Sequence, residues 1–155
     1  MKFVFLFPGK TRSRYLDDGI RDYATRLQRY VPVEMVFLRE KHSRNDSDRI
    51  IIRKEAEQLL SCSRRAPFRV ALDPGGLQPD SEELAAMMQK WEDRSLPAIY
   101  FLTGGHLGLD RSVLREADQV LSLSRLTFTH EMTRLILMEQ LYRACTIRAG
   151  HNYHK

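Results

Sequence analysis

The sequence contains little cysteine. Cys62 and Cys145 are the only two, and each lies within an apolar pattern of helical spacing. Two such residues indicate neither a disulfide framework nor a cysteine-based metal site. Free thiols of this kind are typical of a reducing compartment, so we expect a cytoplasmic protein that binds no metal.

Long hydrophobic runs are also missing. Near the start of the chain, in MKFVFLFPGK, the apolar run is Phe3–Phe7. A run of this length is too short for the apolar region of a signal peptide and far too short to cross a bilayer. We therefore expect this segment to be a buried first strand, and we expect no membrane partner.

Internal repeats, low-complexity segments and interdomain linkers are absent from the 155 residues. A folded chain of this size buries about 70% of the surface that its unfolded form exposes, which is enough for one core. We expect a single domain over residues 1–155. Lysine and arginine total 25 against 20 acidic residues, which gives a formal charge of +5. Nucleic acid is favoured slightly over simple solvated loops by three basic clusters at 9–14, 39–44 and 63–65.

Short apolar runs alternate with segments of helical spacing. The runs predict strands at 3–7, 33–38, 68–73, 98–105 and 119–124. The helical patterns lie around 15–30, 52–60, 81–91, 111–117 and 129–148. Asp80 with Glu83 predicts a capping box, and Asp110 predicts a second helix start. The alternation predicts an α/β fold with a mostly parallel sheet and helices on both of its faces.

The sequences that follow three of these strands are unusual. They read LDPGG (72–76), LTGGHLGLD (102–110) and LSLSRLTFTHE (121–131). Ligands of such sheets bind beyond the carboxyl ends of the strands, so we look for a site there. The glycine loop lacks the G-x-G-x-x-G spacing and a following G-K-[ST], so phosphate binding is weakly supported and a tight connection is the alternative. The LSLS alternation predicts a half-buried strand that presents backbone groups to a pocket.

Charged pairs lie on the last predicted helix. His130 and Arg134 are four residues apart, as are Glu139 and Arg143, so each pair can share a helix face. Capping and surface ion pairing are the alternative to a functional role for them. A hydrolase or phosphatase is disfavoured, since no G-x-S-x-G motif is present.

Three segments together carry a resemblance to a known family. FLTGGHLGL, LSLSRLTFTHEMTRLILMEQLYRA and the terminal Tyr-His occur in order and at matching spacing, over essentially the whole chain. In these features the sequence resembles the bacterial ribosomal large-subunit pseudouridine N3-methyltransferases, within the SPOUT class. The resemblance implies a SPOUT-type knotted fold with a deep C-terminal trefoil knot, a homodimer, and S-adenosyl-L-methionine as cofactor. By position it assigns cofactor contacts to Leu72, Gly104, Leu121, Ser122, Leu123, Ser124, Arg125 and Leu126.

The resemblance also implies a substrate and a set of catalytic residues. The substrate is N3 of a pseudouridine in large-subunit ribosomal RNA on the assembled ribosome. This imide nitrogen must lose its proton as it attacks a methyl group, and the cofactor supplies the electrophile. We expect Arg143, Tyr153 and His154, with Lys155, to hold the base and its phosphates, and we expect the tail of one copy to complete or flank the site of the other. The alternative is a non-catalytic basic RNA-binding module of the ribosome.

Overall fold

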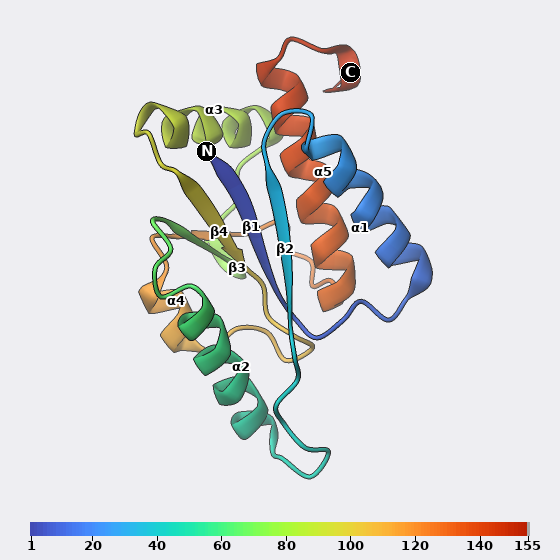
Figure 1. Cartoon of the computed structure of the whole chain (residues 1–155), viewed down its shortest axis with the longest axis vertical. Coiled ribbons are helices and arrows are strands. Elements are labelled where there is room, and N and C mark those ends of the chain that lie inside the picture. The colour runs from blue at the N-terminus through green and yellow to red at the C-terminus, as the bar shows by residue number, and fades with distance from the viewer. Residues whose placement is uncertain (155) are drawn as a thin grey trace.

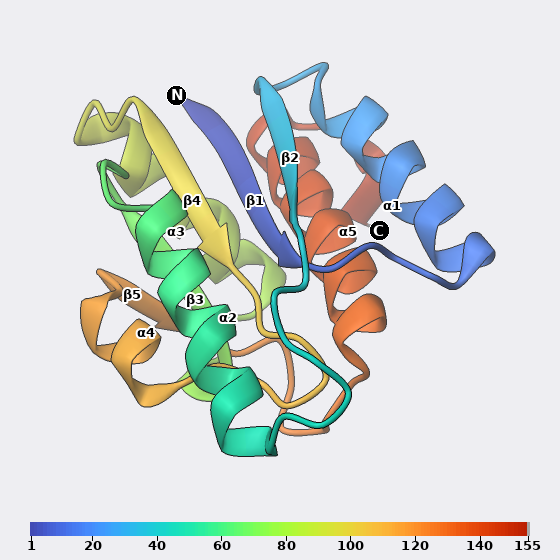
Figure 2. The ribbon, with the colours of Figure 1, turned by 60° about the horizontal axis from the view of Figure 1, so that its bottom comes forward.

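A five-stranded parallel sheet forms the centre of the molecule. The computed structural model describes residues 1–154, and its sheet order is β2-β1-β4-β3-β5 (Figures 1 and 2). All paired strands run parallel. Because β4, β3 and β5 are neighbours and run parallel, the loops that follow them meet at the same end of the sheet. The strands are β1 (Lys2–Pro8), β2 (Val33–Leu38), β3 (Arg69–Leu77), β4 (Ala98–Leu102) and β5 (Gln119–Leu121).

Helices cover both faces of this sheet, as the sequence predicts (Figures 1 and 2). On one face α1, α3 and α5 pack over a core that contains Phe3, Phe5 and Phe7. On the other face α2 and α4 pack over Val4 and Leu6. The alternation of β1 side chains between two apolar layers explains its unbroken hydrophobic run. The helices are α1 (Arg14–Leu27), α2 (Asp48–Cys62), α3 (Ser81–Asp93), α4 (Arg111–Glu116) and α5 (His130–Arg148).

The predicted helix starts are confirmed. Asp80 accepts a hydrogen bond from the Glu83 N–H at 2.8 Å, and the Glu83 carboxylate accepts one from the Asp80 N–H at 2.8 Å. This reciprocal pair satisfies two amides that the first turn of α3 leaves unpaired. Asp110 caps α4 by accepting from the Ser112 N–H at 2.8 Å.

Three strands end several residues away from the predicted position, while β1 and the start of β3 differ by one residue. Strand β3 continues through Pro74, Gly75 and Gly76 to Leu77, with an irregularity in its pairing with β5 between Leu72 and Leu77. Strand β4 ends at Leu102 rather than within the glycines. Strand β5 ends at Leu121, so the prediction of a strand over 122–124 is wrong. The Ser122 N–H still donates to the Leu77 carbonyl oxygen of β3 at 2.7 Å, but the Ser122 and Ser124 hydroxyls form local hydrogen bonds and the chain beyond leaves the sheet.

The two ends of the helical series have features of their own. Tyr15, the first residue of the apolar helical pattern predicted around 15–30, is 71% exposed and lies outside the core. The last residues do not simply fray, since Asn152–His154 form a short 3₁₀ helix after Gly150, whose φ of +69° ends α5.

Within residues 1–154 no helix is long and apolar enough to span a bilayer. The threading of the C-terminal part through a knot stays a prediction.

Candidate functional site

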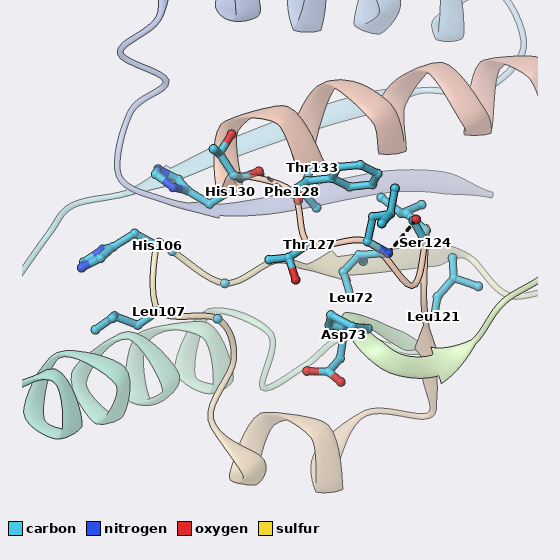
Figure 3. Close-up of a pocket in the computed structure, with 17 residues that line it drawn as sticks. Leu72, Asp73, His106, Leu107, Leu121, Ser124, Thr127, Phe128, His130 and Thr133 are labelled. Atoms are coloured by element: carbon cyan, nitrogen blue, oxygen red, sulfur yellow. Dashed lines mark hydrogen bonds between the residues drawn. The ribbon is translucent and has the colours of Figure 1, made fainter.

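The loops after β3, β4 and β5 enclose a pocket of about 570 Å³, together with the start of α5 (Figure 3). It lies at the carboxyl edge of the sheet, where a parallel α/β fold binds its ligands. The three segments that the sequence singled out are therefore neighbours. The lining residues are Leu72 to Pro74, Gly104 to Gly108, Leu121, Leu123, Ser124, Leu126 to His130 and Thr133.

The residues predicted to contact a cofactor are mostly brought together here. Those on the pocket wall are Leu72, Gly104, Leu121, Leu123, Ser124 and Leu126. Ser122 and Arg125 are not on the wall. Ser122 is buried beneath it, where its hydroxyl donates to the main-chain oxygen of Ser124 at 3.0 Å, and Arg125 is exposed.

The segment after β5 forms a tight turn. The Ser124 hydroxyl accepts a hydrogen bond from the Leu126 N–H at 2.9 Å (Figure 3). Together with the bond from the Ser122 hydroxyl, and the bond of 2.7 Å from the Ser122 N–H to the Leu77 carbonyl oxygen of β3, it fixes the main chain around residues 122–126. Leu126 is left 74% exposed at the mouth of the pocket. The turn therefore presents backbone groups and a leucine side chain to the cavity.

The glycine loop is closed on itself. The Gly108 N–H donates to the Gly105 carbonyl oxygen at 3.1 Å, and Gly108 has a φ of +81°. A Cβ atom on Gly104 would lie 2.4 Å from the Gly108 carbonyl carbon. Only glycine fits at position 104 in this arrangement, because real Cβ atoms do not approach backbone so closely. The tight connection and the pocket wall are thus the same structure.

Histidine and aspartate are the ionisable side chains on the pocket wall. His106 and His130 lie on one side of it, and Asp73 lies on another (Figure 3). Burial lowers the pKa of His130, and the nearby positive charge of Arg134 lowers it further. Neutral His130 is thereby favoured at neutral pH. Most of the remaining wall is leucine, glycine and threonine, which suits a small ligand held by shape and by main-chain groups.

Arg143, Tyr153 and His154, the predicted catalytic residues, lie away from this pocket. His130 is at the first turn of α5 and Arg143 near its last, a separation of about 20 Å at 1.5 Å per residue. Arg143 donates to Glu139 at 2.5 Å, and its guanidinium carbon lies 4.9 Å from the centre of the Tyr153 ring. His154 is exposed, and Lys155 lies outside the described residues.

Tyr153 is docked on its own chain. Its hydroxyl donates to Glu139 at 3.1 Å and lies 3.1 Å from the Tyr23 hydroxyl, while its ring packs edge-on against Tyr142 at 4.8 Å. Burial raises the pKa of Tyr153, so the phenol stays protonated and can donate. Glu139 and Arg143 form the expected ion pair, but they are more than a surface pair, because both also contact Tyr153 of the tail.

Arg134 has a role that sequence reasoning missed. It is completely buried, and it donates to the Gly9 carbonyl oxygen at 3.2 Å and to the Thr11 hydroxyl at 3.0 Å. Burial lowers its pKa to about 10, which leaves it cationic at neutral pH. Surface ion pairing is therefore wrong for Arg134. The available signal was an arginine on the same helix face as the apolar Leu137 and Met138.

Glu131, one turn earlier in α5 than Arg134, holds the loop between β1 and α1 that contains Gly9 and Thr11. Its carboxylate accepts hydrogen bonds from the Arg12 N–H at 2.5 Å and from the Ser13 N–H at 3.1 Å. The basic cluster 9–14 is thus fixed beside the pocket. Cluster 39–44 follows β2 at the same end of the sheet. It contacts cluster 9–14 through the Glu40 carboxylate, which lies 3.6 Å from the Arg12 guanidinium. Cluster 63–65 precedes β3 and lies at the opposite edge.

Residues 1–154 contain no group of side chains suited to a metal ion.

Known proteins resemble this chain along its whole length. The family described as predicted SPOUT methyltransferase matches residues 1–154. The ribosomal RNA large subunit methyltransferase H of Desulfotalea psychrophila is 42% identical over 155 residues, which covers 100% of both chains. The protein of that name from Geobacter metallireducens is 42% identical over 154 residues, covering 99% of each.

A solved structure supports the fold. The crystal structure of a probable methyltransferase from Bordetella pertussis Tohama I superposes with a TM-score of 0.56, at 12% identity, over 93% of this chain and 95% of that one. An identity this low bears on the fold alone. Together with the full-length family match and the relatives at 42% identity, it shows that this chain belongs to the SPOUT methyltransferases, in the family of ribosomal RNA large subunit methyltransferase H.

Proposed function

We propose that this chain is an S-adenosylmethionine-dependent methyltransferase that modifies N3 of a pseudouridine in large-subunit ribosomal RNA on the assembled ribosome. The observation that carries the proposal is the pocket formed by the loops after β3, β4 and β5. The relatives that match over their full length, named as large-subunit methyltransferases, support the choice of substrate.

The pocket fits a cofactor of this kind. Its volume of about 570 Å³ lies within the usual range for small-molecule sites. S-adenosylmethionine carries an adenine and a ribose that suit main-chain groups beside glycine, and SPOUT methyltransferases use it as methyl donor. The residues that would hold it are Leu72, Gly104, Leu121, Leu123, Ser124 and Leu126. The contacts assigned to Ser122 and Arg125 remain predictions.

Bound S-adenosylmethionine supplies an electrophilic methyl group. The protein has to bring N3 of the base into line with that group and accept or share the imide proton. His130 and His106 are the titratable nitrogen bases on the pocket wall. Arg143, Tyr153 and His154 are proposed to hold the base, although in their own chain they lie at the far end of α5.

A homodimer reconciles the tail with the pocket. Since about 20 Å of helix separates the two within one chain, we propose that the tail of a second copy reaches the pocket of the first. Tyr153 and His154 would then complete a site that one chain leaves open. Such an arrangement requires the tail to be held in a defined place, which the contacts of Tyr153 with Glu139 and Tyr142 support.

RNA would lie along the carboxyl edge of the sheet. The basic clusters 9–14 and 39–44 flank the pocket there and present the exposed side chains of Lys10, Arg12, Arg14, Arg39, Lys41 and Arg44. Phosphate contacts of this kind position a structured RNA by its shape rather than by its sequence. A short free RNA offers few of these contacts, so the assembled ribosome is the proposed substrate.

Calorimetric titration with S-adenosylmethionine is the first test of this function, because a non-catalytic RNA-binding module would give no heat. The second is transfer of a radiolabelled methyl group to ribosomes from cells that lack this protein, followed by location of the label in the RNA. We expect binding, and we expect label on a large-subunit pseudouridine. Equal transfer to a short naked oligonucleotide would contradict action on the assembled ribosome.

A further inference from the structure

Glu55 is a buried carboxylate on the inner face of α2. It is only 7% exposed, and its buried neighbours on the helix are Ile51, Ala56 and Leu59. A carboxylate at such a position is costly unless hydrogen bonds and charges compensate for its lost hydration. Nothing in the helical pattern requires an acid there, so the contacts of Glu55 must account for its stability in that place.

Its main contact is with the glycine loop. The Glu55 carboxylate accepts a hydrogen bond from the Gly105 N–H at 3.3 Å, where α2 passes beside the loop (Figure 3). A Cβ atom on Gly105 would lie 2.6 Å from Glu55 Oε1, so the carboxylate lies directly against the main chain. Gly105 is itself on the wall of the pocket. Glu55 therefore acts on the pocket wall through the main chain of Gly105.

Its second contact is with the basic cluster 39–44. His42 Nε2 lies 3.9 Å from Glu55 Oε1, and both side chains are largely shielded from solvent. Two neighbours on α2 also hold the loop that contains this cluster: Lys54 donates to Asp46 at 2.8 Å, and Gln58 donates to the Arg39 carbonyl oxygen at 2.8 Å. Of these three α2 side chains, Glu55 is the one that also reaches the glycine loop.

We propose that Glu55 is a positioning residue that fixes the glycine loop of the cofactor pocket and links it to the basic loop that faces the RNA. This inference rests on the proposed function, because it takes the pocket to hold S-adenosylmethionine. Glu55 touches neither cofactor nor substrate. It sets the place of the Gly105 main chain and, through His42, couples that place to residues 39–44.

The charges around Glu55 suit an ionised carboxylate. Burial raises its pKa, while the Gly105 N–H, His42 and His106 lower it, and Glu40 raises it slightly. Arg134 of α5 also interacts with it across the same edge. The balance keeps the pKa above the ordinary value for glutamate, so the link weakens under acidic conditions, when Glu55 takes up a proton.

Substitution of the charge alone tests the inference. Glu55→Gln keeps the shape and one acceptor oxygen, and Glu57→Gln on the exposed face of α2 is its matched control. We expect Glu55→Gln to raise the dissociation constant for S-adenosylmethionine about tenfold, or about 1.4 kcal/mol, with little change for Glu57→Gln. In methyl transfer, KM for the cofactor should rise more than kcat falls, which a general loss of folded protein would not produce.

The wild-type protein gives an independent measurement. In an NMR titration the amide proton of Gly105 should shift as Glu55 takes up a proton, with a midpoint above about 4.3, the ordinary glutamate value. His42→Ala should move that midpoint upward, because His42 stabilises the carboxylate. Absence of the Gly105 shift would overturn the inference even if Glu55→Gln failed to fold, and an unmoved midpoint would overturn the link to the basic loop.

The outcomes separate this inference from the proposed function. Wild-type binding of S-adenosylmethionine together with equal affinity of folded Glu55→Gln would refute the positioning role alone. A wild-type protein that bound no S-adenosylmethionine would refute the proposed function, and the inference with it.

Discussion

Arg134 of α5 donates a hydrogen bond to the main-chain oxygen of Pro8, 2.5 Å away at the end of β1. The same guanidinium lies 4.9 Å from the centre of the Phe7 ring. Both partners belong to the first strand, while Arg134 belongs to the last helix, so this contact joins the two ends of the fold. It also sets where the basic cluster 9–14 stands relative to the pocket.

Arg134→Met should therefore destabilise the protein strongly. The change leaves the carbonyl oxygens of Pro8 and Gly9 buried without their donor, and we expect a loss of about 3 kcal/mol in the free energy of unfolding. Urea denaturation followed by circular dichroism measures it. Arg53→Met, at an exposed position of α2, is the control and should change stability by less than about 0.5 kcal/mol. Equal stability of the two variants would contradict the anchoring role.

The cap of α4 should give a pH-dependent contribution. Hydrogen bonds from the hydroxyl and then the N–H of Ser112 lower the pKa of Asp110. Because the folded pKa is depressed, the stabilisation is present above the unfolded value of about 3.9 and is lost as the pH falls through the lower folded value. Asp110→Ala should cost about 1 kcal/mol at pH 7. Urea titrations of both proteins should converge toward pH 2, and a constant difference would exclude the charged cap.

The sequence predicts such local features well. Capping pairs such as Asp80 with Glu83 involve residues three apart, and the strand at 33–38 has the predicted bounds because its apolar run is continuous. The regular alternation of strands and helices is likewise enough to give the parallel sheet. Information of this kind lies within a few residues of the feature that it specifies.

Features that depend on distant partners could not be predicted in this way. The LSLS pattern has the period of a strand, but β5 stops at Leu121. The Ser122 hydroxyl donates to the main-chain oxygen of Ser124, and the Ser124 hydroxyl accepts from the Leu126 N–H. The burial of Arg134 and Glu55 depends on carbonyl and amide groups supplied from β1 and from the glycine loop. The strand ends that form the pocket could be predicted from the sequence pattern, and the individual cofactor contacts from the resemblance, whereas the position of Arg143 away from the pocket required the structure.

Gly104→Ala should reduce the affinity for S-adenosylmethionine. The added Cβ atom would meet the Gly108 carbonyl carbon at 2.4 Å, so the collision is within the loop and not with a ligand in the cavity. The loop must open to accommodate the methyl group, and we expect affinity to fall at least about tenfold while the sheet and helices remain folded. Calorimetry measures the binding, and an unchanged circular dichroism spectrum serves as control. Wild-type affinity would remove the loop from the site.

Deletion of residues 151–155 should affect both stability and activity. The deletion removes the packing of Tyr153 on Tyr142 and the hydrogen bond of 2.8 Å between Tyr30 and His151. We therefore expect the free energy of unfolding to fall by about 1 kcal/mol. Methyl transfer to ribosomes should be abolished, while binding of S-adenosylmethionine changes little, since none of residues 151–154 lines the pocket of its own chain. Thermal melting, methyl transfer and calorimetry separate the three effects. Full methyl transfer by the shortened protein would show that the tail has no catalytic role.

A mixture of two impaired variants, assayed at an S-adenosylmethionine concentration too low to fill the Gly104→Ala pocket, tests whether the tail acts on a second copy. Gly104→Ala has a damaged pocket and an intact tail, whereas the protein lacking residues 151–155 has an intact pocket and no tail. In a mixed homodimer the tail of the first can complete the pocket of the second, which gives one working site. After unfolding and refolding together at equal amounts, half of the dimers should be mixed, so about a quarter of the wild-type activity should return. Each variant refolded alone is the control, and a mixture as inactive as its components would mean that each tail serves only its own chain.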